Sequence, residues 1–220
     1  MTRLALLLLV VSLAAPARAQ APRPDAATVA QGLQKRLDTL RDFSADFVHT
    51  YRGGVLRTPV SERGTLAVKR PGKMRWTYTS PEKKTFVSDG RKMYAYLPED
   101  RQVIVSALPP ADEAPTPALF LAGQGQVTRD FTVSWAEEDT TALYALKLVP
   151  KKPEADYLYL VVRLTPATLQ IQELTTIDGQ GGRSTFIFSK LQENRGLPDT
   201  HFAFRIPPNV DVLTDDRSAR

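Results

Sequence analysis

The sequence contains no cysteine among its 220 residues. This absence excludes disulfide bonds, thiolate metal ligands and thiol catalysis. Histidine is almost as scarce, because His49 and His201 are the only two and they form no H-E-x-x-H pattern. We expect each to be an ordinary strand or surface residue, and we expect neither a metal nor a cofactor. A chain without disulfides must take its stability from a hydrophobic core.

Motifs of enzymes are missing as well. There is no phosphate-binding P-loop and no dinucleotide-binding glycine fingerprint. Ser184 lies in "GGRSTF", which lacks the second glycine of a nucleophile elbow. The acidic run Glu137–Asp139 is typical of a solvated turn and not of a catalytic carboxylate pair. The sequence therefore predicts a protein that is not an enzyme.

Long apolar runs are absent beyond the first residues. Leu4–Ala15 is apolar but too short to span a bilayer, and it lies between Arg3 and the small-residue pattern Ala17–Ala19. We predict a signal peptide over residues 1–19, export to the periplasm, and a single domain over residues 20–220. The net charge of +5 falls to +3 when the two leader arginines are removed, which argues against a nucleic-acid partner.

The remaining chain combines one helical pattern with many short strands. Apolar residues recur at helical spacing from Val29 to Phe43, and Thr28 with Gln31 resembles a capping box. Alternation with a period of two follows, which indicates an antiparallel sandwich or barrel. The expected strands are Phe47–Tyr51, Gly64–Lys69, Met74–Tyr78, Thr85–Ser88, Lys92–Tyr96, Gln102–Ser106, Phe131–Trp135, Tyr144–Val149, Tyr157–Leu164, Gln170–Ile177, Arg183–Gln192 and Phe202–Ile206.

The stretch "GTLAVKRPGKMRW" predicts a hairpin whose register is open to two readings. A two-residue loop at Pro71-Gly72 pairs Val68 with Arg75 and Ala67 with Trp76. A three-residue loop from Pro71 to Lys73 instead pairs Val68 with Trp76, Leu66 with Tyr78 and Arg70 with Met74. Only the second gives a continuous apolar face, and we therefore prefer it. Its weak point is that glycine usually takes the last place of such a loop.

In this register Arg70 lies at the edge of an apolar face. A buried guanidinium needs acceptors for its five donors, and no acid stands opposite. The free carbonyl groups at a helix end would serve, so that Arg70 would latch a helical lid over an apolar concavity. The alternative is that Arg70 bends into solvent and covers apolar surface with its stem.

Several motifs together resemble the LolA family of lipoprotein carriers. They are "LQKRLDTLRDFSADF", "GTLAVKRPGKMRW", "SPEKKTFVSDGRKMYAYLPEDRQV", "TPALFLAG" and "FAFRIPPNVDV", which span about Ala26 to Asp216. The resemblance implies a mainly β, α+β fold: an unclosed antiparallel half-barrel with a helical lid over an apolar cavity. It also implies that the arginine of "KRP", Arg70, holds the lid shut by hydrogen bonds. The residues expected in the cavity and lid are Leu33, Leu37, Leu40, Leu66, Val68, Met74, Trp76, Leu119, Phe120 and Leu121.

The resemblance further implies a monomeric carrier with three kinds of partner. These are acylated lipoproteins as cargo, an inner-membrane ABC-transporter complex as donor and an outer-membrane lipoprotein receptor as acceptor. The cations Lys69, Lys73, Arg75, Lys83, Lys84, Arg91 and Lys92 would then steer docking, or they simply protect strand edges from aggregation. Other hypotheses are a carrier of another lipid, a stress-sensing module on the same half-barrel, and an exported esterase, which the motifs disfavour.

Overall fold

The computed structural model describes residues 23–53, 56–108, 120–123, 125–137, 142–154 and 156–215. The predicted signal peptide lies outside these ranges. In the described part of the chain, no helix is both long and apolar enough to cross a membrane.

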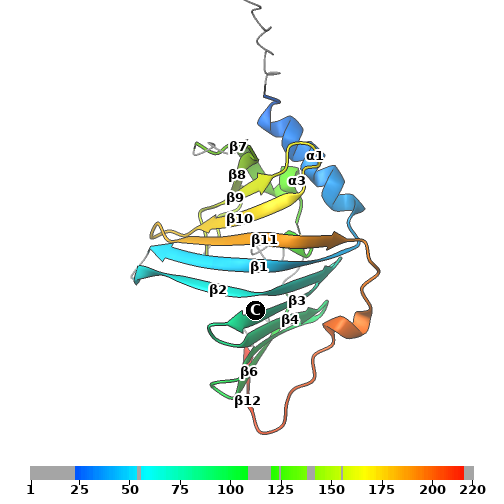
Figure 1. The fold of residues 1–220 in the computed structure, drawn as a ribbon, viewed down its shortest axis with the longest axis vertical. Helices are drawn as coiled ribbons and strands as arrows, with labels where there is room; N and C mark the ends of the chain where they lie inside the picture. Colours follow the sequence, from blue (N-terminus) through cyan, green and yellow to red (C-terminus); the bar gives the residue numbers. More distant parts are fainter. Residues whose placement is uncertain are drawn as a thin grey trace, which may run out of the picture.

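Twelve strands form one sheet that does not close on itself (Figure 1). Their order is β12-β6-β5-β4-β3-β2-β1-β11-β10-β9-β8-β7, and every neighbouring pair is antiparallel except β12 with β6. The mainly β, unclosed sheet with an N-terminal helix confirms the expected fold class. The bounds are β1 (Asp42–Gly53), β2 (Leu56–Lys69), β3 (Lys73–Ser80), β4 (Lys84–Asp89), β5 (Lys92–Leu97), β6 (Gln102–Ala107), β7 (Phe131–Trp135), β8 (Tyr144–Pro150), β9 (Tyr159–Leu164), β10 (Ile171–Ile177), β11 (Arg183–Glu193) and β12 (Asp211–Asp215).

The helix α1 (Ala26–Thr39) lies against one face of the sheet, which we call the inner face. Its stripe of Val29, Leu33 and Leu37 is buried in the same core as the inner side chains of the central strands. The helix ends earlier than the apolar spacing predicted, because Phe43 already belongs to β1 and reaches this core from a strand. The predicted capping box does not form, since the helix begins at Ala26.

The hairpin of β2 and β3 corrects the predicted register. Val68 lies opposite Met74 and Leu66 lies opposite Trp76, so the preferred pairing was shifted by two residues. The three-residue loop is Arg70–Gly72, and Gly72 takes the last place with a φ of +73°. Glycine adopts this left-handed conformation without a steric penalty, whereas Lys73 would not. A shift of two preserves side-chain parity, so the predicted apolar face is retained.

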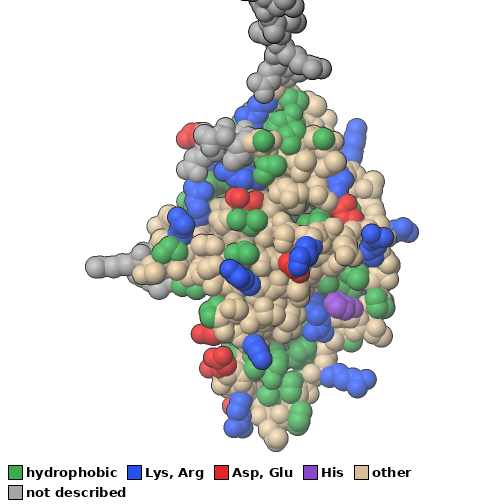
Figure 2. Space-filling view, viewed as in Figure 1, with side chains coloured by type: hydrophobic (Ala, Val, Ile, Leu, Met, Phe, Trp, Pro, Cys, Tyr) green, Lys and Arg blue, Asp and Glu red, His purple; other side chains and the backbone are tan. Residues whose placement is uncertain are grey.

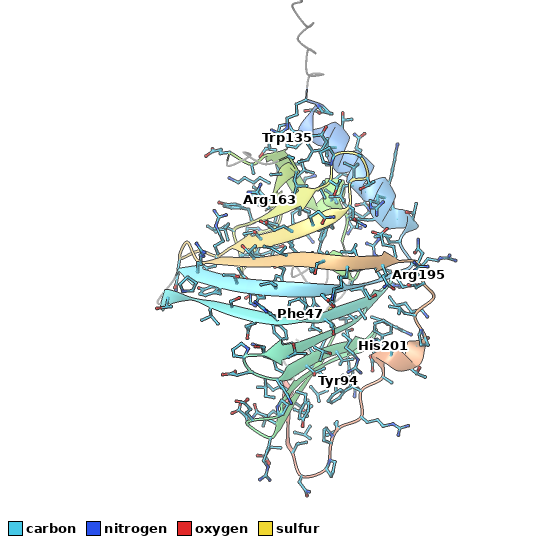
Figure 3. The ribbon with its side chains drawn as sticks, in the orientation of Figure 1. Phe47, Tyr94, Trp135, Arg163, Arg195 and His201 are labelled. Atoms are coloured by element: carbon cyan, nitrogen blue, oxygen red, sulfur yellow. The ribbon has the colours of Figure 1, made fainter. Side chains whose placement is uncertain are left out.

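The C-terminal segment also differs from the prediction. Phe202–Ile206 is not a strand, because a short 3-10 helix, η1 (Asp199–Phe202), occupies its start. Phe202–Ile206 was the last strand predicted, so β12, which follows it in the chain, was missed. The segment leaves β11 near Arg195, passes His201 and descends along the strand ends to β12 (Figure 3). The guanidinium of Arg75 donates to the carbonyl oxygens of His201 at 2.7 Å and Ala203 at 2.8 Å.

Candidate functional site

The inner face of the central strands is apolar and largely aromatic. Period-two alternation places the β2 and β3 side chains Leu66, Val68, Met74 and Trp76 on this face, and all are at most 5% exposed. The ring of Phe47 on β1 lies at the centre, with its centroid 5.2 Å from that of Trp76. These residues form one continuous core with the lid, which we define as α1 together with residues Phe120–Gly123. The lid contributes the buried side chains Leu33, Leu37, Phe120 and Leu121.

A narrow apolar cleft opens between the lid and strands β10 and β11. Its mouth carries the ion pair of Arg36 with Glu193, whose atoms lie 2.6 Å apart. Packed side chains fill the space beneath the lid itself, so an apolar ligand could enter further only by displacing them. The apolar residues that line the cleft are Leu37, Leu40, Phe43, Leu121, Leu169, Ile171, Phe188 and Leu191.

Arg70 joins the sheet to the lid. Its Nη1 donates a hydrogen bond to the carbonyl oxygen of Leu37, in the last turn of α1. This carbonyl is one of the last four of the helix, and it also accepts from the backbone N–H of the C-cap residue Leu40 at 3.1 Å. Burial lowers the pKa of Arg70, and the carboxylate of Asp38 partly counteracts that effect. The guanidinium nevertheless stays protonated, because arginine does not lose its proton in proteins.

The same loop also contacts the second part of the lid. The backbone N–H of Gly72 donates to the carbonyl oxygen of Ala122 at 2.9 Å. Gly123 adopts a φ of +83°, and a Cβ at this position would collide with the guanidinium of Arg70. The tight approach therefore requires glycine there for both conformation and space. One three-residue loop thus binds both pieces of the lid.

The structure brings most of the predicted site residues into this one region. Leu119 lies outside the described residues, and Leu40 is only half-buried because it lines the cleft. The cations grouped by the sequence analysis do not form one docking patch. Lys69 and Lys73 pair with Asp199, while Lys84 reaches the inner face. On the face that carries His201, Lys and Arg side chains are scattered and not gathered over one hairpin (Figure 2).

A polar cluster on the inner face was missed by the sequence analysis. His49, predicted to be an ordinary strand or surface residue, is bonded to Glu62 and Ser184, and Lys84 pairs with the same glutamate. The signal lay in the alternation, since His49 follows Phe47 by two residues and Glu62 precedes Gly64 by two. Among the described residues, no group of three or more acidic or histidine side chains is arranged to hold a metal ion.

Comparison with known proteins is consistent with this architecture. A family model described as outer membrane lipoprotein carrier protein LolA matches residues 38–205. The chain is 33% identical over 204 residues to an outer-membrane lipoprotein carrier protein of Chromobacterium violaceum, covering 93% of this chain and 92% of that protein. It is 33% identical over 185 residues to a protein of the same description from Methylococcus capsulatus, covering 83% and 86%.

Among solved structures, an uncharacterized conserved protein from Thermus thermophilus shares the fold. The TM-score is 0.53 at 11% sequence identity, and the match covers 86% of this chain and 98% of that chain. The family match spans the hairpin loop with Arg70, the inner face and the described lid residues from Asp38 onward. The chain therefore belongs to the LolA family of outer-membrane lipoprotein carrier proteins, a non-enzymatic carrier family.

Proposed function

We propose that this protein is a periplasmic carrier that shields the acyl chains of lipoproteins between the inner and the outer membrane. One observation supports this most directly: an apolar inner face lies beneath a lid that one loop holds shut. Acyl chains would lie between the lid and the aromatic side chains around Phe47, and the cleft at Leu40 and Leu121 would hold part of them. Arg70 would act as the latch of the lid through its bond to Leu37.

The energetics of such a carrier require the lid to compete with the cargo. Burial of an acyl chain is worth about 0.8 kcal/mol per CH₂, hence roughly 12 kcal/mol for a palmitoyl chain before any cost. Three chains at that value would exceed the practical ceiling of non-covalent affinity, about 20 kcal/mol. A carrier with that affinity would never release its cargo. Displacement of the packed lid side chains and rupture of the Arg70 bond return part of this energy, which brings the loaded and empty states closer together.

Loading and release then call for two partners of different kinds. An inner-membrane ABC-transporter complex would supply the free energy that lifts the cargo out of the bilayer, and an outer-membrane lipoprotein receptor would accept it. The carrier needs only an affinity between those of its two partners. The predicted leader over residues 1–19 would deliver it to the compartment between them.

The test is to express the full chain in a Gram-negative host, purify it from the periplasm and record native mass spectra. We expect a fraction to carry triacylated lipoprotein, and we expect the purified protein to release lipoproteins from spheroplasts into the supernatant. Leu40→Gln at the cleft should reduce both, whereas Ile187→Gln, at an exposed strand position, should not. Protein that carries only a free lipid or a sterol, and releases no lipoprotein, would overturn the proposal.

A further inference from the structure

The inner face ends in a polar cluster, which we define as His49, Glu62, Lys84 and Ser184. These residues come from β1, β2, β4 and β11 and lie toward the strand ends that are remote from Arg70. The Nδ1 atom of His49 lies 2.9 Å from Glu62 Oε2, and its Nε2 atom lies 2.8 Å from Ser184 Oγ. Lys84 Nζ donates to Glu62 Oε1 at 2.5 Å.

The hydrogen-bond partners fix where the protons are. Hydrogen bonds from Lys84 and His49 lower the pKa of Glu62 although burial alone would raise it, so the side chain is a carboxylate that can only accept. The Nδ1 atom of His49 must therefore carry a proton. The Nε2 atom of the neutral ring is then an acceptor, and the hydroxyl group of Ser184 donates to it. Lys84 Nζ also lies 4.6 Å from the ring centroid of Tyr78. The lone pairs of Ser184 Oγ and the N–H group of Lys84 that faces neither Glu62 nor this ring remain to serve a ligand.

The cluster carries no net charge. The charges of Glu62 and Lys84 cancel each other. Burial lowers the pKa of His49 below its ordinary value of 6.5, so the ring is neutral at pH 7. The carbonyl oxygen of a neutral ester or amide can accept from Lys84, and the N–H of an amide can also donate to Ser184 Oγ, without either group meeting an uncompensated charge. A carboxylate or phosphate would instead lose water and face Glu62, with no free cation in return.

Aromatic rings connect this cluster to the core beneath the lid. The ring of Phe186 stacks on His49 with centroids 4.2 Å apart and contacts the ring of Trp76 at 5.1 Å. Phe186 is only partly buried, so the aromatic surface continues from the core toward solvent. The Nε1 of Trp76 is buried and has no acceptor among the described residues. A buried indole N–H usually has a partner, so a donor stands unused between the apolar and polar parts of the face.

We propose that the polar cluster binds the neutral ester and amide groups at the head of an acylated ligand, with the acyl chains directed under the lid. The cluster thereby selects acyl esters and acyl peptides over free fatty acids and anionic phospholipids. This inference rests on the proposed carrier function and assigns it a ligand orientation and a head-group preference. The unused N–H of Trp76 takes an ester or amide carbonyl of the ligand.

The order serine, histidine, glutamate resembles the relay of a hydrolase, but its surroundings do not. Ser184 lies in the interior of the sheet, where β11 is paired with β1 on one side and with β10 on the other. The backbone N–H groups around Ser184 are thus committed to the ladder and cannot form an oxyanion hole. The cluster is a set of binding groups in a family of carriers.

The experiment is a competition assay in which a fluorescent acyl probe is displaced from the full-length mature protein. The competitors are a synthetic triacylated cysteinyl peptide, palmitate and phosphatidylglycerol. For the unaltered protein we expect the acyl peptide to compete at least tenfold better than palmitate. Glu62→Gln leaves Lys84 without a counter-charge, and we expect it to improve competition by palmitate about tenfold while the acyl peptide changes little.

Matched controls separate a head-group effect from loss of folding. Glu173→Gln also removes an acidic partner of a cation, Arg163, but it lies on the opposite face, and the preference should stay unchanged. Trp76→Phe keeps an aromatic ring and removes the N–H, and we expect the acyl peptide to bind about fivefold more weakly, in line with one lost hydrogen bond.

Two different failures can be told apart. If the unaltered protein binds the acyl peptide but Glu62→Gln leaves the ratio of the two affinities as it was, the head-group proposal is wrong and the carrier function stands. If the unaltered protein binds no acylated competitor, the carrier function falls and the head-group proposal falls with it.

Discussion

The guanidinium of Arg70 donates a hydrogen bond to the carbonyl oxygen of Leu37. This bond connects the β2–β3 loop to the last turn of α1, two segments that are 33 residues apart in the chain. We expect this bond to break when the lid opens for cargo, and it would then stabilise the empty state relative to the loaded one.

We predict that Arg70→Leu binds acylated cargo more tightly and releases it more slowly. A hydrogen bond of a charged group is worth about 1.5–3 kcal/mol, which corresponds to roughly 10–150-fold in affinity. The measurement is transfer of a labelled lipoprotein from the carrier to acceptor vesicles. Arg63→Leu, at an exposed position of the preceding strand β2, should transfer at the normal rate. Unchanged loading and release in Arg70→Leu would show that the bond is not a latch.

Gly123→Ala should reproduce the Arg70→Leu phenotype although Arg70 itself is not substituted. The added methyl group would displace the guanidinium, and a φ of +83° costs an L-residue roughly 1–2 kcal/mol. Gly181→Ala is the matched control, since its φ is +78° and its Cβ would meet nothing within 4 Å. Urea denaturation should show a loss of stability in both variants. Only Gly123→Ala should alter cargo affinity, and equal affinities in the two would contradict the prediction.

Asp42→Ala should destabilise the fold by about 2 kcal/mol, because it removes a buried carboxylate that accepts hydrogen bonds from two backbone N–H groups. The carboxylate, 3% exposed, accepts from the backbone N–H groups of Arg195 at 2.8 Å and Gly196 at 3.0 Å. Asp46→Ala removes a surface pair with Lys190 and should cost less than about 1 kcal/mol. Chemical denaturation of both variants measures the loss of unfolding free energy. Equal losses in Asp42→Ala and Asp46→Ala would contradict the prediction.

The pH dependence of stability should contain a contribution from His49. Burial lowers its pKa below 6.5, although Glu62 raises it in part and Lys84 lowers it further. The folded protein then binds a proton less readily than the unfolded chain. This contribution to stability is complete above pH 6.5 and is lost as the pH falls through the folded pKa.

His49→Gln should therefore lose less stability than the unaltered protein between pH 7.5 and pH 5.5. The other groups that face the ring are the Ser184 hydroxyl and the ring of Tyr78, which do not titrate in this range. The lowered pKa of Glu62 lies in more acidic solution, below 4.5. Urea midpoints at the two pH values give the result, and an equal or steeper loss in His49→Gln would refute it.

The sequence was most informative where local patterning decides structure. Period two placed Leu66, Val68, Met74 and Trp76 on one face, and this held although the register was wrong by two residues. The need of Arg70 for a carbonyl acceptor followed from the chemistry of the guanidinium. The packing of α1 against the sheet determines that the Leu37 carbonyl is the acceptor, and no local sequence pattern specifies this packing.

Features that depend on distant segments could not be predicted. The contact of His49 with Ser184 joins residues 135 apart, and it exists only because β1 pairs with β11. Likewise, Phe202 reads as a strand residue by its alternation, yet η1 forms where Lys69 and Lys73 meet Asp199. Pairing of β12 with β6 depends on the same distant course of the chain.

The polar contacts of α1 differ between its two sides, and from this difference we predict how the lid opens. Toward the β7–β11 side the helix is tied by Arg36 to Glu193, and Gln34 accepts the backbone N–H of Val127 in α3 (Val127–Asp130). Toward the β2–β6 side, the described residues offer one polar tie to the helix, from Arg70. Loss of the Arg70 hydrogen bond would free the side of α1 that faces β2–β6, while the contacts on the β7–β11 side remain. We therefore expect α1 to rotate about its side that faces β7–β11. The opening for an acyl chain would then form on the side that faces β2–β6.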